Sequence, residues 1–224
     1  MNDNYPQAYK TGSIDFYGRD FRVSPDVLIP RPESEMIIDA VLNLAGKPYL
    51  PGIVPSAAKV ASSARILDVG TGSGCLATTL SLELDQADVT GVDISKRALV
   101  VAEDNCKRLG GRVKFFESDL IDVVSGHFDI IVANLPYVDP NWDWLDKDAL
   151  SAEPALALYA EDGGLFLIKR LIRELSERRS NISFDYLILE SDPCQHEEIK
   201  KYASEFGLKH IETRGFVQVY FFSL

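Results

Sequence analysis

The residue types best suited to chemistry gather in a glycine-rich turn. After Asp68 and Val69 the chain reads Gly70, Thr71, Gly72, Ser73, Gly74. Because glycine has no side chain, the main chain can turn sharply here and its amide groups can lie against a bulky ligand. The turn follows a predicted strand and opens a predicted helix, where free N–H groups are available. The sequence therefore predicts a ligand site at this turn.

Two classes of cofactor fit this turn. A dinucleotide fits because Gly72-x-Gly74-x-x-Ala77 satisfies the loose fingerprint, with Asp93 about 20 residues further on as a ribose ligand. S-adenosylmethionine fits better, because the Asp68 carboxylate would repel a pyrophosphate but suits an amino group and a positive sulfonium. The Asp-x-Gly-x-Gly-x-Gly pattern resembles motif I of the class I methyltransferases.

Two more aspartates, Asp93 and Asp119, end predicted strands in the order that this resemblance implies. In that fold the first holds the ribose hydroxyls and the second the adenine amino group. Taken alone, either could simply cap a helix. Together with the glycine turn they favour S-adenosylmethionine over NAD. The expected cofactor-binding residues are Asp68, Gly70, Thr71, Gly72, Gly74, Asp93, Asp119, Leu120 and Asn134.

A second candidate is the tetrapeptide Asn134-Leu135-Pro136-Tyr137, which directly follows the apolar run 128–133. An amide nitrogen is a poor nucleophile, and a pocket that accepts both of its N–H bonds orients it toward a methyl donor. Asn134 offers its side-chain oxygen and Leu135 its carbonyl. Pro136 stiffens the turn, and Tyr137 offers a flat face for a planar amide or base. We expect these four residues to be catalytic, although an ordinary Asn-x-Pro turn also fits them.

The elements that must position these residues alternate between strands and helices from residue 64 onward, which predicts a parallel sheet of roughly seven strands. The final segments 208–212 and 216–222 predict a hairpin, so an antiparallel strand would finish the sheet. Before them, residues 13–23 predict a β-hairpin and a helix follows Pro32. The composition of the Pro- and Ala-rich stretch 46–63 predicts a linker. We expect an N-terminal piece, 1–63, and a methyltransferase domain, 64–224.

At this point the sequence resembles the release factor glutamine methyltransferases, the HemK or PrmC family. Besides the glycine turn and the tetrapeptide, the resemblance rests on four further blocks: Phe16-Tyr17-Gly18, residues 27–35 (VLIPRPESE), residues 153–158 (EPALAL) and residues 162–165 (DGGL). It implies an α/β fold, a Rossmann-like class I methyltransferase sheet led by a short hairpin and helix. It also implies methyl transfer from S-adenosylmethionine to the glutamine amide of the Gly-Gly-Gln motif in a peptide chain release factor, a protein of translation termination.

Two features depart from the family pattern. Leu135 stands where the family has proline, which keeps the carbonyl but gives up some rigidity. The family also carries a helical N-terminal domain, whereas 15 residues precede the first block here. We therefore allow for an unknown partner in place of that domain. A non-catalytic S-adenosylmethionine-binding subunit is one alternative, and N6-adenine methylation of nucleic acid, which uses a similar tetrapeptide, is another.

Charge and composition exclude or disfavour several kinds of partner, location and metal site. The net charge of -11 disfavours a long nucleic-acid partner. The three cysteines have no pairing pattern, and no apolar run is long enough for a membrane, so we expect a cytoplasmic protein. The three histidines show no ligand spacing, and we predict no metal. Trp142 and Trp144 lie in an acidic segment, either as ordinary loop packing or along the path of the protein substrate.

Overall fold

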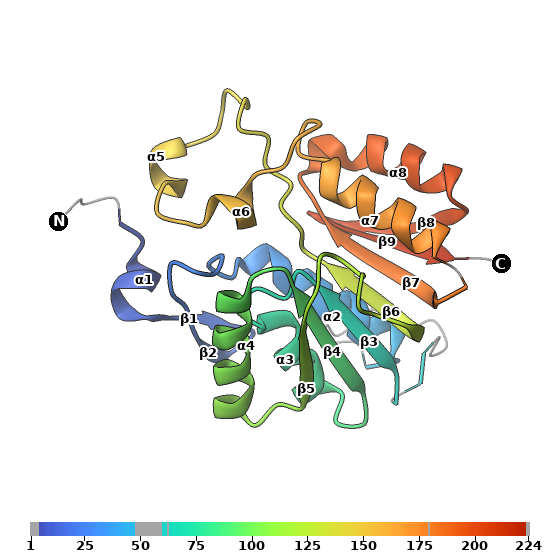
Figure 1. Ribbon diagram of the computed structural model, residues 1–224, viewed down its shortest axis with the longest axis horizontal. Coiled ribbons are helices and arrows are strands. Elements are labelled where there is room, and N and C mark those ends of the chain that lie inside the picture. Colours follow the sequence, from blue (N-terminus) through green and yellow to red (C-terminus); the bar gives the residue numbers. More distant parts are fainter. Residues whose placement is uncertain (1–4, 48–59, 62, 179, 223–224) are drawn as a thin grey trace.

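The computed structural model describes residues 5–47, 60–61, 63–178 and 180–222. Most of the linker expected at 46–63 lies outside the described residues. The centre of the fold is a seven-stranded sheet in the order β5-β4-β3-β6-β7-β9-β8 (Figure 1). Its strands are β3 (Arg65–Val69), β4 (Asp88–Asp93), β5 (Val113–Glu117), β6 (Gly126–Ala133), β7 (Ile182–Glu190), β8 (Leu208–Arg214) and β9 (Val217–Phe222).

Strands β3 to β7 pair in parallel, which confirms the mostly parallel sheet predicted from the sequence. The predicted closing hairpin is confirmed, and its last strand, β9, is the antiparallel one, but that strand does not lie at the edge of the sheet. Strand β9 pairs antiparallel with both β7 and β8, so it lies between them and β8 forms the edge. The hairpin folds back so that its second strand, which is apolar, enters the sheet interior, where Val219 and Tyr220 are buried.

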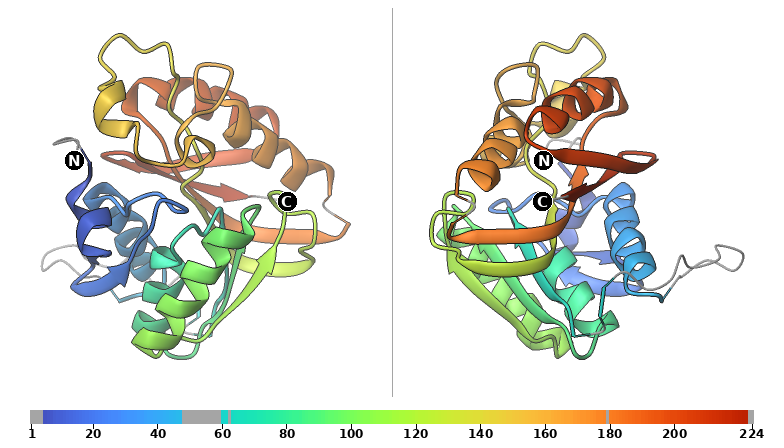
Figure 2. Two further views of the ribbon diagram at one scale, coloured as in Figure 1. Left: turned by 60° about the vertical axis from the view of Figure 1, so that its left-hand side comes forward. Right: turned by 90° about the vertical axis from the view of Figure 1, so that its right-hand side faces the viewer.

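Helices cover both faces of this sheet (Figure 2). On one face, α2 (Glu35–Leu44) and α3 (Cys75–Glu83) share a core with Ile66 and Ile130. On the other face, α7 (Phe166–Glu177) and α8 (His196–Glu205) share a core with Leu67 and Ile131. These pairs of neighbouring strand residues point to opposite faces because side chains alternate along a strand. Helix α4 (Lys96–Leu109) packs beside α3 and β5, and Ser95 caps its first turn.

The N-terminal segments lie against this sheet and its helices. Strands β1 (Ser13–Phe16) and β2 (Arg19–Arg22) form the expected hairpin, and the 3-10 turn η1 (Pro32–Ser34) leads into α2. Phe16 and Phe21 belong to the same core as α2 and α3. Three short helices are not predicted by the sequence pattern: α1 (Gln7–Thr11), α5 (Lys147–Leu150) and α6 (Ala155–Leu158). Short helices carry too few apolar repeats for periodicity to reveal them.

One long excursion leaves the sheet between β6 and α7. Its two ends meet in a parallel bridge between Val138 and Tyr159, where the Val138 amide donates to Leu158 (3.0 Å) and the Ala160 amide donates to Val138 (3.1 Å). Helices α5 and α6 lie within this excursion, above the carboxyl ends of the strands (Figure 1). No helix among the described residues is long and apolar enough to cross a membrane.

Candidate functional site

A cavity of about 530 Å³ opens at the carboxyl ends of β3, β4, β5 and β6. Its floor includes the glycine turn and the residues that follow these strands, and its roof comes from residues 25–34 and from 154–157 of the excursion. Ligands of open α/β sheets bind at this edge. The wall includes nine of the residues expected from the sequence: Gly70, Thr71, Gly72, Asp93, Asp119, Leu120, Asn134, Leu135 and Pro136.

The glycine turn is fixed from the neighbouring strand. The amides of Gly70 and Thr71 both donate to the carbonyl of Val92 at 2.9 Å. Gly70 has φ +76°, and a Cβ there would lie 2.9 Å from Cδ2 of Leu135. Both the backbone conformation and the close contact therefore require glycine at this position. The turn thus lies directly against the tetrapeptide.

Asp68 and Gly74 contribute to the turn without lining the cavity. The buried Asp68 carboxylate accepts the Thr71 hydroxyl at 2.7 Å and the Ala77 amide at 3.2 Å, so it joins the turn to the start of α3. Burial raises the pKa of Asp68 to about 7, although these hydrogen bonds lower it. Both hydrogen bonds end on Oδ2, and Oδ1 is buried without a hydrogen-bond partner among the described residues. Asp68 therefore supports the turn through one oxygen.

Asp93 stands at the end of β4 and faces the cavity. One carboxylate oxygen accepts the Gly72 amide and the other the Ser95 amide, both at 2.8 Å. Burial raises the pKa of Asp93, and these backbone hydrogen bonds oppose the shift. Each carboxylate oxygen retains a second acceptor site. The side chain is thus oriented to accept hydroxyl groups of a ligand.

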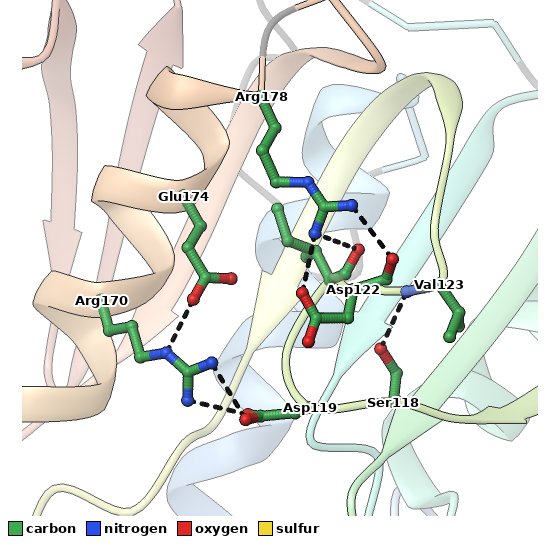
Figure 3. Close-up of polar contacts among 8 residues, drawn as sticks. Ser118, Asp119, Asp122, Val123, Arg170, Glu174 and Arg178 are labelled. Carbon is green, nitrogen blue, oxygen red and sulfur yellow. Dashed lines mark hydrogen bonds and ion pairs between the residues drawn. The ribbon is translucent and has the colours of Figure 1, made fainter.

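Asp119, after β5, is held by a residue that the sequence analysis missed. Arg170 of α7 donates to both carboxylate oxygens of Asp119 at 2.9 Å and also binds Glu174 (Figure 3). Arg170 itself lines the cavity. Between Asp119 and Ile121, Leu120 adopts φ +47°, an uncommon conformation for a non-glycine residue. This local conformation accompanies the placement of its side chain on the cavity wall.

Asn134 is oriented by a buried serine from the N-terminal segment. Its Nδ2 donates to Oγ of Ser34 at 2.9 Å. Close to this pair lies the buried Glu190, at the end of β7, whose Oε2 has no hydrogen-bond partner among the described residues. The Tyr137 hydroxyl lies 3.3 Å from Oε1 of Glu190. Burial raises the pKa of Glu190 to about 7, and the neighbouring polar groups of Ser34, Tyr137 and Asn134 oppose this shift.

Tyr137 is not part of the cavity wall, although the sequence analysis expected its ring to stack on a substrate. Burial and the nearby Glu190 raise the pKa of its hydroxyl, so it stays a donor. Its carbonyl accepts a hydrogen bond from Nε2 of Gln195, which also donates to the carbonyl of Gly163, both at 2.8 Å. A Cβ on Gly164 would lie 2.0 Å from that carbonyl, which explains why glycine follows Gly163. Tyr137 therefore connects the tetrapeptide to its surroundings.

The roof is tied together by an ion pair between two segments that the resemblance singled out. Arg31 donates to Oε1 of Glu153, whose other oxygen accepts the Ile29 amide at 3.1 Å. The Glu153 side chain is only 2 % exposed, whereas that of Arg31 is 33 % exposed and lines the cavity. The contact fixes residues 25–34 over the site.

Ser34, Glu190, Arg170 and Gln195 are the site residues that the sequence analysis missed. Glu190 carried a usable signal, because an acidic residue ends the apolar run 186–189 just as Asp93 ends its own strand. A separate group, His127, Asp129 and Asp185, brings three potential metal ligand atoms within 4.8 Å. The prediction of no metal was based on histidine spacing alone. It could not include this group, because its residues come from two strands, β6 and β7.

Comparisons with known proteins concern the family and the fold of the chain. Residues 54–170 match the family model "Methyltransferase small domain". A release factor glutamine methyltransferase of Koribacter versatilis is 43 % identical over 175 residues, which cover 77 % of this chain and 58 % of the relative. Another, of Neisseria gonorrhoeae, is 36 % identical over 210 residues, which cover 92 % of this chain and 71 % of the relative.

A crystal structure of a methyltransferase from Pyrococcus furiosus has the same fold, with a TM-score of 0.61 and 18 % identity, and the likeness covers 93 % of this chain and 91 % of that one. It confirms the predicted fold class. The matched region of the Koribacter relative is somewhat more than half of that protein's own length. By the identity and coverage of both relatives, the chain belongs to the release factor glutamine methyltransferase family.

Proposed function

We propose that this protein transfers the methyl group of S-adenosylmethionine to the side-chain amide nitrogen of a glutamine, in the Gly-Gly-Gln motif of a peptide chain release factor. The observation that carries the proposal is the orientation of Asn134. Its amide nitrogen donates to Oγ of Ser34, and no donor among the described residues forms a hydrogen bond with its Oδ1. A cavity-lining carboxamide fixed in this way offers an acceptor to an incoming N–H group.

The cavity suits S-adenosylmethionine. Asp93 and Asp119 offer carboxylate oxygens at two neighbouring strand ends, as ribose hydroxyls and an adenine amino group require. Ile94, Leu120 and Leu135 add apolar walls for a flat base. When bound, this cofactor supplies an electrophilic methyl group on a positive sulfonium.

The tetrapeptide provides the chemistry that the substrate amide needs. Oδ1 of Asn134 accepts one N–H of the glutamine and the carbonyl of Leu135 accepts the other, which holds the nitrogen in line with the methyl group. Methyl transfer would be a direct displacement in which the new N–C bond forms as the bond from the methyl carbon to the sulfonium sulfur breaks, and the nitrogen, then positive, would lose its proton to water. A strong general base is therefore unnecessary.

Calorimetry tests the cofactor. Asp93→Ala should weaken S-adenosylmethionine binding by about 1.5–3 kcal/mol, the scale of hydrogen bonds to a charged group. NAD should not bind the wild-type protein. Equal S-adenosylmethionine affinity in the variant, together with NAD binding, would favour the dinucleotide alternative.

Labelled S-adenosylmethionine tests the substrate. We expect the label in a purified release factor, and neither in duplex DNA nor in a ribosomal protein that bears a methylatable glutamine. Asn134→Ala should lower turnover on the order of 10²-fold or more with little change in cofactor affinity. Label in duplex DNA would indicate an adenine methyltransferase. Cofactor binding without transfer to any of the three substrates would indicate a non-catalytic subunit. The expected substrate places the reaction in the cytoplasm.

A further inference from the structure

The excursion between β6 and α7 contains a segment that the proposed chemistry does not use. Residues 139–148 form its outward part, whereas the returning part supplies Pro154, Leu156 and Ala157 to the cavity wall. Because the excursion closes at Val138 and Tyr159, its outward part begins two residues after Tyr137. Anything bound to it is therefore tethered close to the entrance of the site.

This segment presents aromatic surface to solvent. The rings of Trp142 and Trp144 stack with centroids 5.2 Å apart and planes 21° from parallel. Trp144 is 67 % exposed, and neither ring lines the cavity. Stacking buries one face of each ring and leaves much of the Trp144 ring in water. Exposed aromatic surface beside a functional site is typical of an interaction surface.

The charge of the same segment is strongly negative. Residues 139–148 contain four aspartates and one lysine. Asp143, between the two tryptophans, is exposed, and neither it nor Asp139 forms an ion pair with any described residue. We call residues 139–148 the acidic tryptophan loop. Aromatic faces and carboxylates together bind lysine and arginine side chains, by cation–π contact and by ion pairing.

We propose that the acidic tryptophan loop docks a lysine- or arginine-bearing segment of the protein substrate and so holds its glutamine at the cavity. The substrate part of this inference rests on the proposed function. Charge complementarity selects the occupant, because the negative net charge of the segment, with Asp143 exposed between the tryptophans, repels the phosphates of a nucleic acid and attracts a basic polypeptide. A cofactor-sized ligand has no need of this loop, which lies outside the cavity wall.

Tryptophan fluorescence, excited at a wavelength beyond the tyrosine absorption band, reports on this loop alone, since the chain has two tryptophans and both lie in it. The probes are a Gly-Gly-Gln peptide flanked by three lysines on each side, the same peptide with serines in place of the lysines, and a single-stranded RNA oligonucleotide. The lysine peptide should change the emission saturably, with an affinity that falls as salt rises. A stronger effect of the serine peptide or of the RNA would overturn the proposal.

Two surface variants and a matched control complete the test. Asp143→Asn should weaken lysine-peptide binding about 3-fold and Trp144→Ala about 5-fold, since each removes one exposed contact. Glu205→Gln, which removes another exposed carboxylate, on α8, should leave lysine-peptide binding unchanged. With a release factor as substrate, the first two variants should raise KM by similar factors and leave kcat at saturation and S-adenosylmethionine affinity unchanged.

The binding and kinetic experiments separate the two proposals. Peptide binding with the expected variant effects, but no methylation of a release factor, would contradict the proposed function and leave a loop that binds basic segments. Methylation with unchanged KM in both variants would contradict the docking proposal alone.

Discussion

Arg170 donates to both carboxylate oxygens of Asp119 at 2.9 Å, so helix α7 fixes the end of β5 at the cavity (Figure 3). Eight residues along the chain, Arg178 holds the same loop through Asp122 at 2.9 Å. Only Arg170 lines the cavity. Arg178 therefore supports the loop, whereas Arg170 orients the Asp119 carboxylate that faces the cavity.

Arg170→Gln should weaken S-adenosylmethionine binding by about 1 kcal/mol, roughly a 5-fold rise in Kd, because Asp119 loses its bidentate partner and its fixed orientation. Titration calorimetry measures this directly. Arg178→Gln is the matched control: it should lower the unfolding midpoint slightly and leave Kd unchanged. Equal Kd values for the two variants would contradict the role assigned to Arg170.

Ser34→Ala should lower turnover about 10-fold, because without Oγ the Asn134 amide can rotate and present its nitrogen to the cavity. The effect should be smaller than that of Asn134→Ala, since part of the population keeps the productive orientation. Single-turnover methylation at saturating S-adenosylmethionine measures both. Ser191→Ala, which removes a neighbouring buried hydroxyl without a partner among the described side chains, is the control and should retain turnover.

Arg31→Ala should reduce the free energy of unfolding by about 3 kcal/mol, because the buried Glu153 carboxylate would keep only the Ile29 amide as a partner. The double substitution Arg31→Ala with Glu153→Gln should recover part of this loss, since it also removes the buried charge. Urea unfolding of the wild type and both variants provides the comparison. If the double variant were less stable than Arg31→Ala alone, the unpaired Glu153 charge would not be the cause of the stability loss.

The stability of the protein should fall between about pH 4.5 and 7 through Glu190. Its folded-state pKa of about 7 exceeds the ordinary value of 4.5, so the folded state binds the proton more tightly than the unfolded state. The free energy of unfolding therefore decreases as pH rises through this window. Glu190→Gln removes this dependence and should gain on the order of 3 kcal/mol relative to the wild type from pH 4.5 to 8.

Urea unfolding at pH 5, 6, 7 and 8 measures this difference. Asp68, whose pKa is also raised to about 7, titrates in both proteins and cancels in the comparison. Glu205→Gln provides an exposed control. A stability difference between Glu190→Gln and the wild type that stays constant with pH would contradict the assignment.

The local parts of the site were predictable from the sequence because their signals are local. Gly70 and Asp93 are revealed by a turn between predicted elements and by the end of an apolar run. The supports were not predictable, because they join distant segments: Asn134 and Ser34 are 100 residues apart, and Asp119 and Arg170 are 51 apart. Strand order posed the same problem, since no local pattern says that β9 enters the sheet between β7 and β8.

The bridge between Val138 and Tyr159 has a consequence for how such proteins diverge. A segment whose two ends meet can lengthen, shorten or change composition at little conformational cost, because the sheet beneath does not register its length. Residues 139–152 can therefore be replaced by the corresponding segment of a relative, while the strands and the glycine turn stay the same. Grafting residues 139–152 onto a related protein should transfer the proposed preference for basic segments without changing the residues that carry out methyl transfer.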